Sequence, residues 1–533
     1  MAKDILTEIC DRRREDIARL GFCYGHEVPQ TRKRPIVPFL PKPGTILEIK
    51  RASPSKGQIA PDLDAAKTAK AYIKAGTAAI SCLTEQNYFH GSLDDLQAAC
   101  RAAEKKAAVL RKDFLLDEEE VRIAYRCGAD AVLLIARILE EEKLVSMART
   151  AFELGIAVLL EVREDGDVEK ALTVLSEAHR LNADDKIVLG INSRDLSNFT
   201  IDLLIPLKLK ERILHLFKER KTNLPIPRII SESGITTPAA ADFTGHLGFH
   251  GVLIGEAAAR NPAEAKRLVK SFCGGAKAAA HHLDYEFSFW KKLSARLSER
   301  EEQKTARPLV KICGLTNKED ALLAAELGAD ILGFIFAEKS PRTNAAEEKT
   351  ADMLRDVRSE AERLHSEGKI PRVPLMVGVI VDVASELGNA AYELCYEGVL
   401  DGIQFHGCPE LAQGALGYPA LPVAGEEELK TLALLYSVGF PRVLVDAKNL
   451  SGTYADGDAR YGGTGTQLSE SLVEAVKKQG TLWLSGGITP ENSAPLTARF
   501  APELLDVCSG IESAPGKKDA EKLTNLFRAL QNA

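Results

Sequence analysis

Residues 125–136 read YRCGADAVLLIA, and residues 325–337 repeat the arrangement as AELGADILGFIFA. In both stretches a helix-like segment stops at a glycine, which suits the left-handed position just past a helix end. A near-continuous apolar run follows, as expected for a strand that is covered on both faces. Alternating helices and strands of this kind are typical of a parallel sheet. Further copies occur at 72–83, 152–162, 395–407 and 435–447.

About eight such units can be counted in each half of the chain, the number that closes a (β/α)8 barrel. Each set spans roughly 210–230 residues, close to the ~250 typical of this barrel. A doubly wound sheet in each half is the alternative, but the missing G-x-G-x-x-G fingerprint and the count of eight argue against it. We therefore predict an α/β protein with two consecutive (β/α)8 TIM barrels joined by a helical linker. The strands should begin near Thr45, Ala78, Ala107, Ala131, Ala157, Ile187, Arg228 and Val252, and then near Leu309, Ile331, Leu375, Gly402, Leu421, Val443, Leu482 and Leu504.

The stretch between the two sets is charged and helix-prone. We predict one barrel domain at 1–272, a linker at 273–307 and a second barrel domain at 308–533. A chain of 533 residues is too long for one ordinary core, which agrees with this division.

The composition argues against several classes of function. The formal net charge of −7 gives no general attraction to nucleic acid or to an anionic membrane. No apolar run approaches the ~18–20 residues that span a bilayer, and the charged start lacks the apolar core of a secretory signal. The ten cysteines are scattered without a C-x-x-C pair, so we expect a reduced, cytoplasmic compartment and neither zinc nor a disulfide framework.

Polar side chains gather where the strands of the first half end, which is where a (β/α)8 barrel carries its chemistry. In ILEIKRASPSKG (46–57), Glu48 and Lys50 stand two residues apart and therefore share one face of the strand. An isolated buried charge costs several kcal/mol unless it is paired, so such a set indicates a binding or catalytic site. A buried ion-pair network without chemistry is the alternative. The other strand-end residues are Lys112, Glu161, Asn192, Arg194, Glu232 and Ser233.

The second half has polar strand ends of its own. Cys313 ends the first strand, and Asp446 ends the sixth, across the predicted barrel. A single cysteine is usually a small buried apolar group, but a cysteine facing an aspartate in this position suits an acid–base pair. The glycine-rich RYGGTG at 460–465 is either a linker or a loop over the ligand. Arg342, Gln404, His406 and Asp506 complete the set.

Glycines follow the seventh and eighth strands in both halves. They occur in SESGITT (231–237) and LIGEAAARNP (253–262), and again in LSGGITPEN (484–492) and VCSGIES (507–513). Barrels often bind a phosphate between these two loops, through backbone N–H groups that glycine leaves accessible. We predict one phosphorylated ligand per barrel, the alternative being plain helix N-terminal turns. The candidate residues are Gly234, Gly255, Gly486, Gly487, Ser509 and Gly510.

Residues 1–272 resemble indole-glycerol-phosphate synthases through EIKRASPSKG, LRKDF, LLEV, GINSRDL, SESGI and LIGEA, in order and one per strand. Residues 308–533 resemble phosphoribosylanthranilate isomerases through VKICGLT, GFIFAEKSPR, GVIVD, IQFHG, VDAK, YGGTG, LSGGI and LDVCSGIE. Together these motifs cover nearly the whole chain, which resembles the family of fused bifunctional enzymes of tryptophan biosynthesis.

The resemblance implies two consecutive reactions. The C-terminal barrel would convert N-(5-phosphoribosyl)anthranilate to carboxyphenylamino-deoxyribulose phosphate by an Amadori rearrangement. The N-terminal barrel would close that product to indole-glycerol phosphate, with loss of carbon dioxide and water. Neither step needs a metal or organic cofactor. The partners implied are phosphosugar anthranilate substrates, with association with other tryptophan-pathway enzymes left open.

The resemblance also implies roles for individual residues. In the first barrel Lys112 would be the general acid with Glu161 as its acid–base partner, and Lys50 would hold the substrate carboxylate. Which lysine protonates at which step stays open. Glu48 would orient Lys50 and the substrate. Asn192 would donate a hydrogen bond, Arg194 would organise the wall, Glu232 and Ser233 would line the mouth, and Ser53 would lie in the covering loop.

In the second barrel Asp446 would be the general acid and Cys313 the general base, while Arg342 would grip the anthranilate carboxylate. Glu256 departs from the family pattern, since a serine or threonine often binds phosphate there; we expect its carboxylate to point away and its backbone to bind. Segment 345–372 is expected to be a surface excursion with a solvated face, and segment 206–227 is a second long excursion to which no role is assigned. Two phosphosugar barrels with other substrates, or a scaffold with one inactive barrel, are the competing hypotheses.

Overall fold

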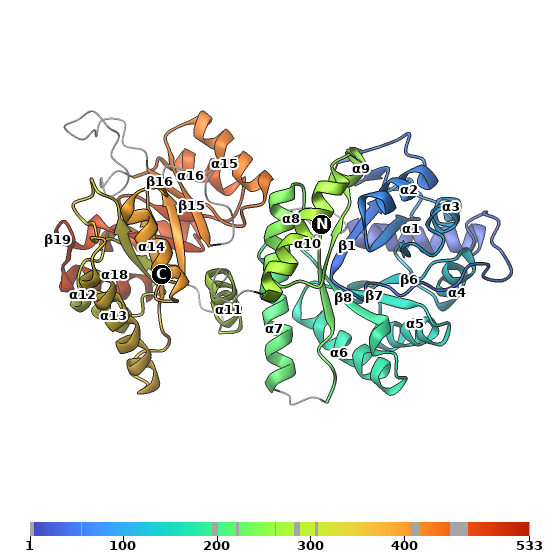
Figure 1. Cartoon of the computed structure of the whole chain (residues 1–533), viewed down its shortest axis with the longest axis horizontal. Helices are drawn as coiled ribbons and strands as arrows, with labels where there is room; N and C mark the ends of the chain where they lie inside the picture. Colours follow the sequence, from blue (N-terminus) through green and yellow to red (C-terminus); the bar gives the residue numbers. More distant parts are fainter. Residues whose placement is uncertain are drawn as a thin grey trace. The chain divides into compact units, whose positions relative to one another are not determined.

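Eight parallel strands close into a barrel in each half of the chain, which confirms the predicted pair of (β/α)8 barrels (Figure 1). The chain forms two compact units, 1–282 and 283–533. The computed structural model describes residues 5–54, 56–194, 201–219, 223–261, 263–281, 288–303, 307–406, 416–447 and 467–531.

The first barrel closes because β1 pairs with both β4 and β10. Its strands are β1 (Gly44–Ile49), β4 (Ala79–Leu83), β5 (Ala108–Lys112), β6 (Ala131–Ile135), β7 (Ala157–Val162), β8 (Ile187–Asn192), β9 (Arg228–Glu232) and β10 (Gly251–Ile254). Its helices are α1 (Ile5–Leu20), α2 (Ala65–Ala75), α3 (Leu93–Ala103), α4 (Glu118–Cys127), α5 (Glu141–Glu153), α6 (Asp165–Arg180), α7 (Ile205–Glu219), α8 (Pro238–His246), α9 (Glu256–Arg260) and α10 (Ala265–His281). A short hairpin of β2 (Ala52–Ser53) and β3 (Gly57–Gln58) follows β1.

The second barrel closes through the pairing of β11 with β18. Its strands are β11 (Leu309–Ile312), β12 (Ile331–Phe336), β13 (Leu375–Ile380), β14 (Gly402–His406), β15 (Gly417–Val423), β16 (Leu444–Ala447), β17 (Trp483–Ser485) and β18 (Leu504–Val507). Its helices are α11 (Ser288–Glu302), α12 (Lys318–Leu327), α13 (Glu348–Ser366), α14 (Glu386–Tyr396), α15 (Glu426–Val438), α16 (Glu470–Lys477), α17 (Pro490–Phe500) and α18 (Ala520–Gln531). The hairpin β19 (Glu512–Ala514) and β20 (Lys517–Lys518) follows β18. Across the described parts of both units, no helix has the length and apolar character that crossing a membrane requires.

The strands begin within one residue of their predicted starts, with one exception. β15 begins at Gly417, four residues before the predicted Leu421. The sequence there is GYPALPV, in which glycine and proline read as turn signals. The strand forms nevertheless, because its residues pair with β14 and β16 on either side.

The two predicted surface excursions are helices of the barrels. Segment 206–227 contains most of α7, whose Leu207, Ile213 and Phe217 are buried. Segment 345–372 contains α13, whose buried stripe includes Leu354 and Val357. The solvated face expected for 345–372 is present, but the segment is a barrel helix and not an excursion, since an amphipathic helix on a barrel is polar wherever it meets water.

The repeated GAD motif joins a helix end to the neighbouring strand at the amino-terminal end of each barrel. Gly128 and Gly328 end their helices with φ of 101° and 100°. The buried carboxylates of Asp130 and Asp330 then accept backbone N–H groups from the preceding strand at 2.9 Å. Arginines pair with both aspartates: Arg32 and Arg34 with Asp130, and Arg307 with Asp330.

The stretch predicted as a linker contributes to a helix in each unit. Helix α10 packs on α8 in the first unit, and α11 belongs to the second unit. In α11, Phe289 and Trp290 are fully buried. Phe289 lies 5.3 Å from Tyr418 of β15, and Trp290 lies 6.5 Å from Trp483 of β17, between ring centroids. A Cβ on Gly402, which begins β14, would lie 2.9 Å from Phe289 Cβ. Helix α11 therefore closes the amino-terminal end of the second barrel.

Replacing Phe289 by alanine should destabilise the second unit by about 3–5 kcal/mol, because it leaves a cavity beneath the barrel. The only two tryptophans in the sequence, Trp290 and Trp483, both lie in this unit. Tryptophan fluorescence during urea unfolding of the full chain therefore reports on it selectively. Leu434→Ala is the matched control, because Leu434 is 60% exposed and its loss should leave the midpoint nearly unchanged. An unshifted midpoint in Phe289→Ala would argue against α11 as part of this fold.

Two candidate active sites

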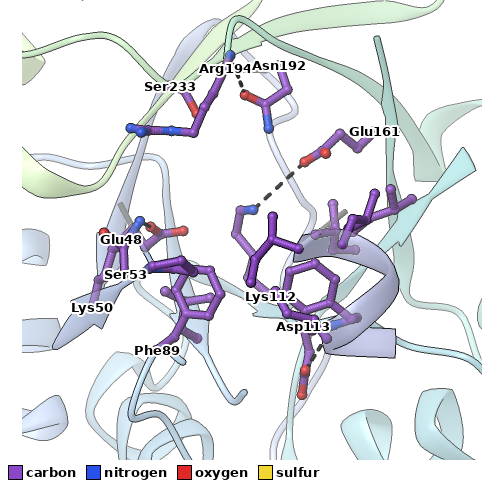
Figure 2. A pocket seen from close by; sticks show the side chains of 18 residues that line it. Glu48, Lys50, Ser53, Phe89, Lys112, Asp113, Glu161, Asn192, Arg194 and Ser233 are labelled. Carbon is purple, nitrogen blue, oxygen red and sulfur yellow. Dashed lines mark hydrogen bonds and ion pairs between the residues drawn. The ribbon is translucent and has the colours of Figure 1, made fainter. Parts of the chain in front are cut away.

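The strand ends of the first barrel surround a cavity of about 730 Å³, counted with its open mouth (Figure 2). The cavity is lined by both polar and apolar side chains. The sequence-predicted residues that line it are Glu48, Lys50, Ser53, Lys112, Glu161, Asn192, Arg194 and Ser233. The apolar residues are Ile5, Leu6, Ile9, Pro54, Leu83, Phe89, Phe114, Leu133 and Ile135. A cavity with this mixed lining suits a flat aromatic ring that carries anionic groups.

Lys112 projects from the end of β5 into the centre of the cavity (Figure 2). Its Nζ lies 3.9 Å from Glu161 Oε2 and 3.8 Å from Glu232 Oε2. Burial alone would lower the pKa of Lys112, but the carboxylates of Glu232 and Glu161 outweigh burial and raise it above its ordinary value. The side chain is therefore a charged ammonium at neutral pH, positioned to donate a proton.

Glu232 lies beneath this ammonium and is almost completely buried. Burial, reinforced by the Glu161 carboxylate, raises the pKa of Glu232 to about 8, against the opposing effect of Lys112. Neither carboxyl oxygen of Glu232 has a hydrogen-bond partner among the described residues. A Cβ on Gly190 would lie 2.0 Å from Glu232 Oε1, so the glycine in β8 provides the space for this carboxyl group.

Glu48 and Lys50 lie together at the end of β1, as their spacing predicts. Lys50 Nζ lies 3.3 Å from Glu48 Oε1, and Ser81 Oγ donates a hydrogen bond to Glu48 Oε2 at 3.2 Å. Lys50 Nζ also lies 5.4 Å from the centroid of the Phe89 ring. The ammonium of Lys50 is thus held between a carboxylate and an aromatic face at the cavity edge.

The ends of β8 and β9 form the far wall of the cavity (Figure 2). Arg194 N donates to Asn192 Oδ1 at 2.9 Å, which shapes the turn after β8. Burial lowers the pKa of Arg194, opposed by the carboxylates of Glu256 and Glu48. Ser233 has a φ of 68°, a left-handed conformation that turns the chain sharply into Gly234.

The candidate phosphate residues of the first barrel follow β9 and β10. Gly255 precedes α9 and packs on Glu48, since a Cβ there would lie 2.6 Å from Glu48 Oε1. The carboxylate of Glu256 pairs with Arg260 at 3.0 Å, one turn further along α9.

Helix α1 is a part of the site that the strand-end reasoning missed. Its Leu6 and Ile9 pack into the apolar side of the cavity. Arg13 fixes the helix there, with Nη2 at 2.7 Å from both Asp113 Oδ2 and Glu120 Oε1. The position of this helix depends on contacts with residues 100 and 107 positions away, which the sequence does not reveal.

In the second barrel Lys311 is the centre of the polar cluster, and it was not predicted. Its fully buried Nζ lies 2.8 Å from Asp506 Oδ2 and donates to Gln404 Oε1 at 2.8 Å. Tyr418 also donates to Gln404 Oε1 at 3.2 Å. The predicted Gln404 and Asp506 are therefore brought together by a lysine that stands two residues before Cys313.

Two further predicted residues surround Lys311 and have shifted pKa values. Burial, reinforced by the Asp506 carboxylate, raises the pKa of Asp446 to about 7. Burial and the charge of Lys311 lower the pKa of His406 to about 4. At neutral pH, Asp446 is thus able to hold a proton while His406 is uncharged, which suits acid–base work in this cluster.

Cys313 contacts a second cysteine, Cys508, from the neighbouring strand end. A hydrogen bond from Cys508 lowers the pKa of Cys313, burial opposes this, and Lys311 lowers it further. Cys313 is 6% exposed, so its thiol lies inside the barrel mouth. These effects make loss of the Cys313 proton easier, which suits a base at this position.

Arg342 is paired with Glu512, which lies 170 positions further along the chain. Its Nε and Nη2 donate to Glu512 at 2.8–3.1 Å. Lys518 Nζ donates to the same carboxylate at 3.0 Å and to Cys313 O at 2.6 Å. Neither Glu512 nor Lys518 was predicted, since both belong to the hairpin after the last strand.

The candidate phosphate residues of the second barrel lie in two loops that touch. A Cβ on Gly510 would lie 2.0 Å from Ile488 O, so only glycine permits this approach. Gly486 and Gly487 have positive φ values of 95° and 60°. Ser509 and Gly510 belong to the turn after β18. The predicted loop RYGGTG at 460–465 lies outside the described residues. Within the described ranges, no group of three or more His, Cys, Asp or Glu side chains is placed to hold a metal ion.

Two family models match the chain, one in each half. A family model described as indole-3-glycerol phosphate synthase matches residues 34–271, and one described as N-(5′-phosphoribosyl)anthranilate isomerase matches residues 310–529. Tryptophan biosynthesis protein TrpCF of Vibrio parahaemolyticus is 31% identical over 503 residues, which cover 91% of this chain and 84% of that protein.

Longer and shorter proteins are similar as well. The multifunctional tryptophan biosynthesis protein of Phycomyces blakesleeanus is 31% identical over 520 residues, covering 90% of this chain. This chain spans only 62% of that protein's length. The crystal structure of phosphoribosyl anthranilate isomerase from Thermus thermophilus has 32% identity and a TM-score of 0.31, and covers 42% of this chain and 98% of that one.

Proposed function

Since the chain belongs to the family of tryptophan biosynthesis proteins that join an indole-3-glycerol phosphate synthase to a phosphoribosylanthranilate isomerase, we propose that its two barrels catalyse consecutive reactions. The second barrel isomerises N-(5-phosphoribosyl)anthranilate to carboxyphenylamino-deoxyribulose 5-phosphate. The first barrel closes this product to indole-3-glycerol phosphate. We assign the activities to the predicted domains 1–272 and 308–533. An association with other enzymes of the pathway stays a prediction.

The observation that carries this proposal is the cavity of the first barrel. It places the Lys112 ammonium 3.8–3.9 Å from two carboxyl groups, in a cavity that the Lys50–Glu48 pair and apolar side chains also line. Closing an indole ring requires an acid at a sugar carbonyl, a cation for a carboxylate and a dry face for an aromatic ring. The cavity offers all three.

In the first barrel Lys112 protonates the sugar carbonyl oxygen as the aromatic carbon attacks the carbonyl carbon and a C–C bond forms. Lys50 holds the carboxylate that leaves as carbon dioxide, and Glu48 orients Lys50. Glu161 then assists the loss of water. Each proton transfer of this kind contributes ~10²–10⁴-fold to the rate.

The remaining residues of the first barrel bind and enclose the substrate in this proposal. Asn192 and Ser233 hydrogen-bond the sugar, and Arg194 shapes the wall with Glu232 below. Ser53 lies in the hairpin beside the mouth and helps to cover the ligand. The backbone at Gly234, Gly255 and Glu256 binds the phosphate.

In the second barrel Asp446 donates a proton to the ribose ring oxygen, which opens the ring. Cys313 removes the proton from the neighbouring sugar carbon, and the resulting enol becomes the ketone. Gln404, His406 and Asp506 line the site around Lys311.

Two groups bind the anionic ends of this substrate in the proposal. The carboxylate of Glu512 accepts hydrogen bonds from Arg342 Nε and Nη2. We propose that the third nitrogen, Nη1, donates to the anthranilate carboxylate. The phosphate is bound by the loops after β17 and β18, through Gly486, Gly487, Ser509 and Gly510.

A coupled assay tests the whole proposal. The full chain is supplied with phosphoribosylanthranilate, and loss of anthranilate fluorescence and appearance of indole-3-glycerol phosphate are followed together. We expect both signals, with the carboxyphenylamino intermediate appearing between them. Turnover by neither barrel would exclude the proposal, and turnover by one barrel alone would favour a chain with one inactive domain.

The isomerase should lose activity as the pH rises above about 7, because Asp446 must carry its proton to act as the acid. Because Cys313 must also lose its proton to act as the base, the profile should be bell-shaped, with Asp446 and Cys313 setting its two limbs. Asp506→Asn removes the neighbouring carboxylate that raises the pKa of Asp446, so the fall should begin at lower pH. The check is a profile of isomerase kcat/KM against pH for both proteins. A profile that Asp506→Asn leaves unmoved would contradict the assignment of Asp446.

A further inference from the structure

Two cysteines stand next to each other at the carboxyl ends of neighbouring strands in the second barrel. The register pairs Ile312 of β11 with Val507 of β18, and Cys313 N donates to Val507 O at 2.9 Å. Cys313 and Cys508 are the next residues along these two parallel strands. Neighbouring strands lie about 4.8 Å apart, inside the 4.4–6.8 Å range of Cα separations that disulfides span.

The two thiols also face each other. The thiol of Cys508 donates a hydrogen bond to Cys313, and both cysteines are free. A Cβ on Gly314 would lie 2.9 Å from Cys508 Sγ, so the sulfur is turned towards β11 across a space that glycine leaves open.

The surroundings favour oxidation of this pair. Lys518 Nζ donates to Cys313 O and lies 3.3 Å from Cys508 O, and Lys311 carries a second ammonium in the same cluster. Cations near a thiol favour the thiolate, which is the form that reacts with oxidants. Asp506 opposes this effect but is itself paired with Lys311. Cys508 is partly exposed, which gives small oxidants a way in.

We propose that Cys313 and Cys508 form a reversible disulfide when the protein meets a peroxide, and that this bond stops the second barrel while the first continues. The Cys313 thiolate attacks one peroxide oxygen, the O–O bond breaks, and the hydroxide that leaves takes a proton to become water. The Cys508 sulfur then attacks the resulting sulfenic sulfur, and its proton leaves with the hydroxyl group as a second water. Two thiols are oxidised, and one peroxide is reduced to two waters.

The loss of isomerase activity rests on the proposed function, in which Cys313 is the base, whereas the bond itself does not. A disulfide takes away the electron pair that Cys313 would use to accept a proton. The cavity of the first barrel has no cysteine among the described residues that line it. Ring closure by the first barrel therefore serves as an internal control in the same molecule.

The test uses the full chain, hydrogen peroxide, an alkylating agent to block remaining thiols, and trypsin. The two cysteines fall in separate tryptic peptides, 312–318 and 500–517. We expect a linked pair two hydrogens lighter than the sum of the free peptides. Isomerase activity should fall about tenfold or more and return with dithiothreitol, while ring closure of supplied intermediate stays unchanged.

Two variants sharpen this experiment, each compared with its own untreated sample. Cys508→Ser has no resolving thiol, so sustained peroxide should carry Cys313 to a sulfinic acid, and dithiothreitol should no longer restore activity. Cys395→Ala removes another buried cysteine of the same barrel and should behave as the natural sequence does. Unlinked peptides after peroxide, with or without loss of activity, would overturn the proposal. Linked peptides with full isomerase activity would overturn the role of Cys313 as the base.

Discussion

Lys112→Ala should lower the rate of ring closure by about 10²–10⁴-fold or more while the isomerase keeps its activity. The substitution removes the ammonium that lies between Glu161 and Glu232 in the first cavity. Lys50 also lines the cavity, but its ammonium is paired with Glu48. Supplied with phosphoribosylanthranilate, the variant should therefore accumulate carboxyphenylamino-deoxyribulose phosphate, measured by chromatography of the reaction mixture.

A control separates chemistry from folding in this experiment. Lys74 lies exposed near the end of α2, and Lys74→Ala should leave both activities unchanged. Because Lys112 compensates two buried carboxyl groups, the variant should also be checked for an unchanged thermal transition of the first unit. Loss of both activities in Lys112→Ala would contradict independent sites, and normal ring closure would exclude Lys112 as the acid.

Cys313→Ala should have the reverse effect, lowering isomerisation by about 10²–10⁴-fold without slowing ring closure. The base that removes the sugar proton is lost, while Asp446 and the Lys311 cluster remain. The measurement is the decay of anthranilate fluorescence with phosphoribosylanthranilate, followed by ring closure of supplied intermediate in the same preparation.

The matched variant is Cys395→Ala, which removes a buried thiol on α14 that lies in the hydrophobic core of the same barrel. It should retain isomerase activity, so that loss of a buried cysteine as such cannot account for the result. If Cys313→Ala kept more than about a tenth of the isomerase rate, the proton would have to go to another group.

The barrels and the polar residues at their strand ends could be predicted from the sequence because both features depend on local patterns. A glycine after a helix and an apolar run after the glycine are both written within a dozen residues, and they placed β6 and β12 at their observed starts. The same locality put Glu48 beside Lys50, since residues two apart on a strand share a face.

Contacts between distant parts of the chain could not be predicted in this way. Glu512 meets Arg342 across 170 positions, and Lys311 meets Asp506 across 195. Neither pairing leaves a periodic mark in the sequence, because it depends on barrel closure. The packing of helix α11 could not be predicted for the same reason. Its charged residues resemble those of a linker, but the buried Phe289 and Trp290 determine where it packs.

The paired aspartates of the GAD motif have a consequence for how such barrels change. Asp130 and Asp330 precede β6 and β12, whereas the side chains assigned to chemistry follow the other ends of strands. The residues that stabilise the barrel therefore lie one strand length away from those that select its substrate. Substitutions can accumulate at the catalytic end of a barrel without disturbing the aspartate contacts that stabilise its other end. Two copies of one architecture in a single chain are thereby free to diverge towards different reactions.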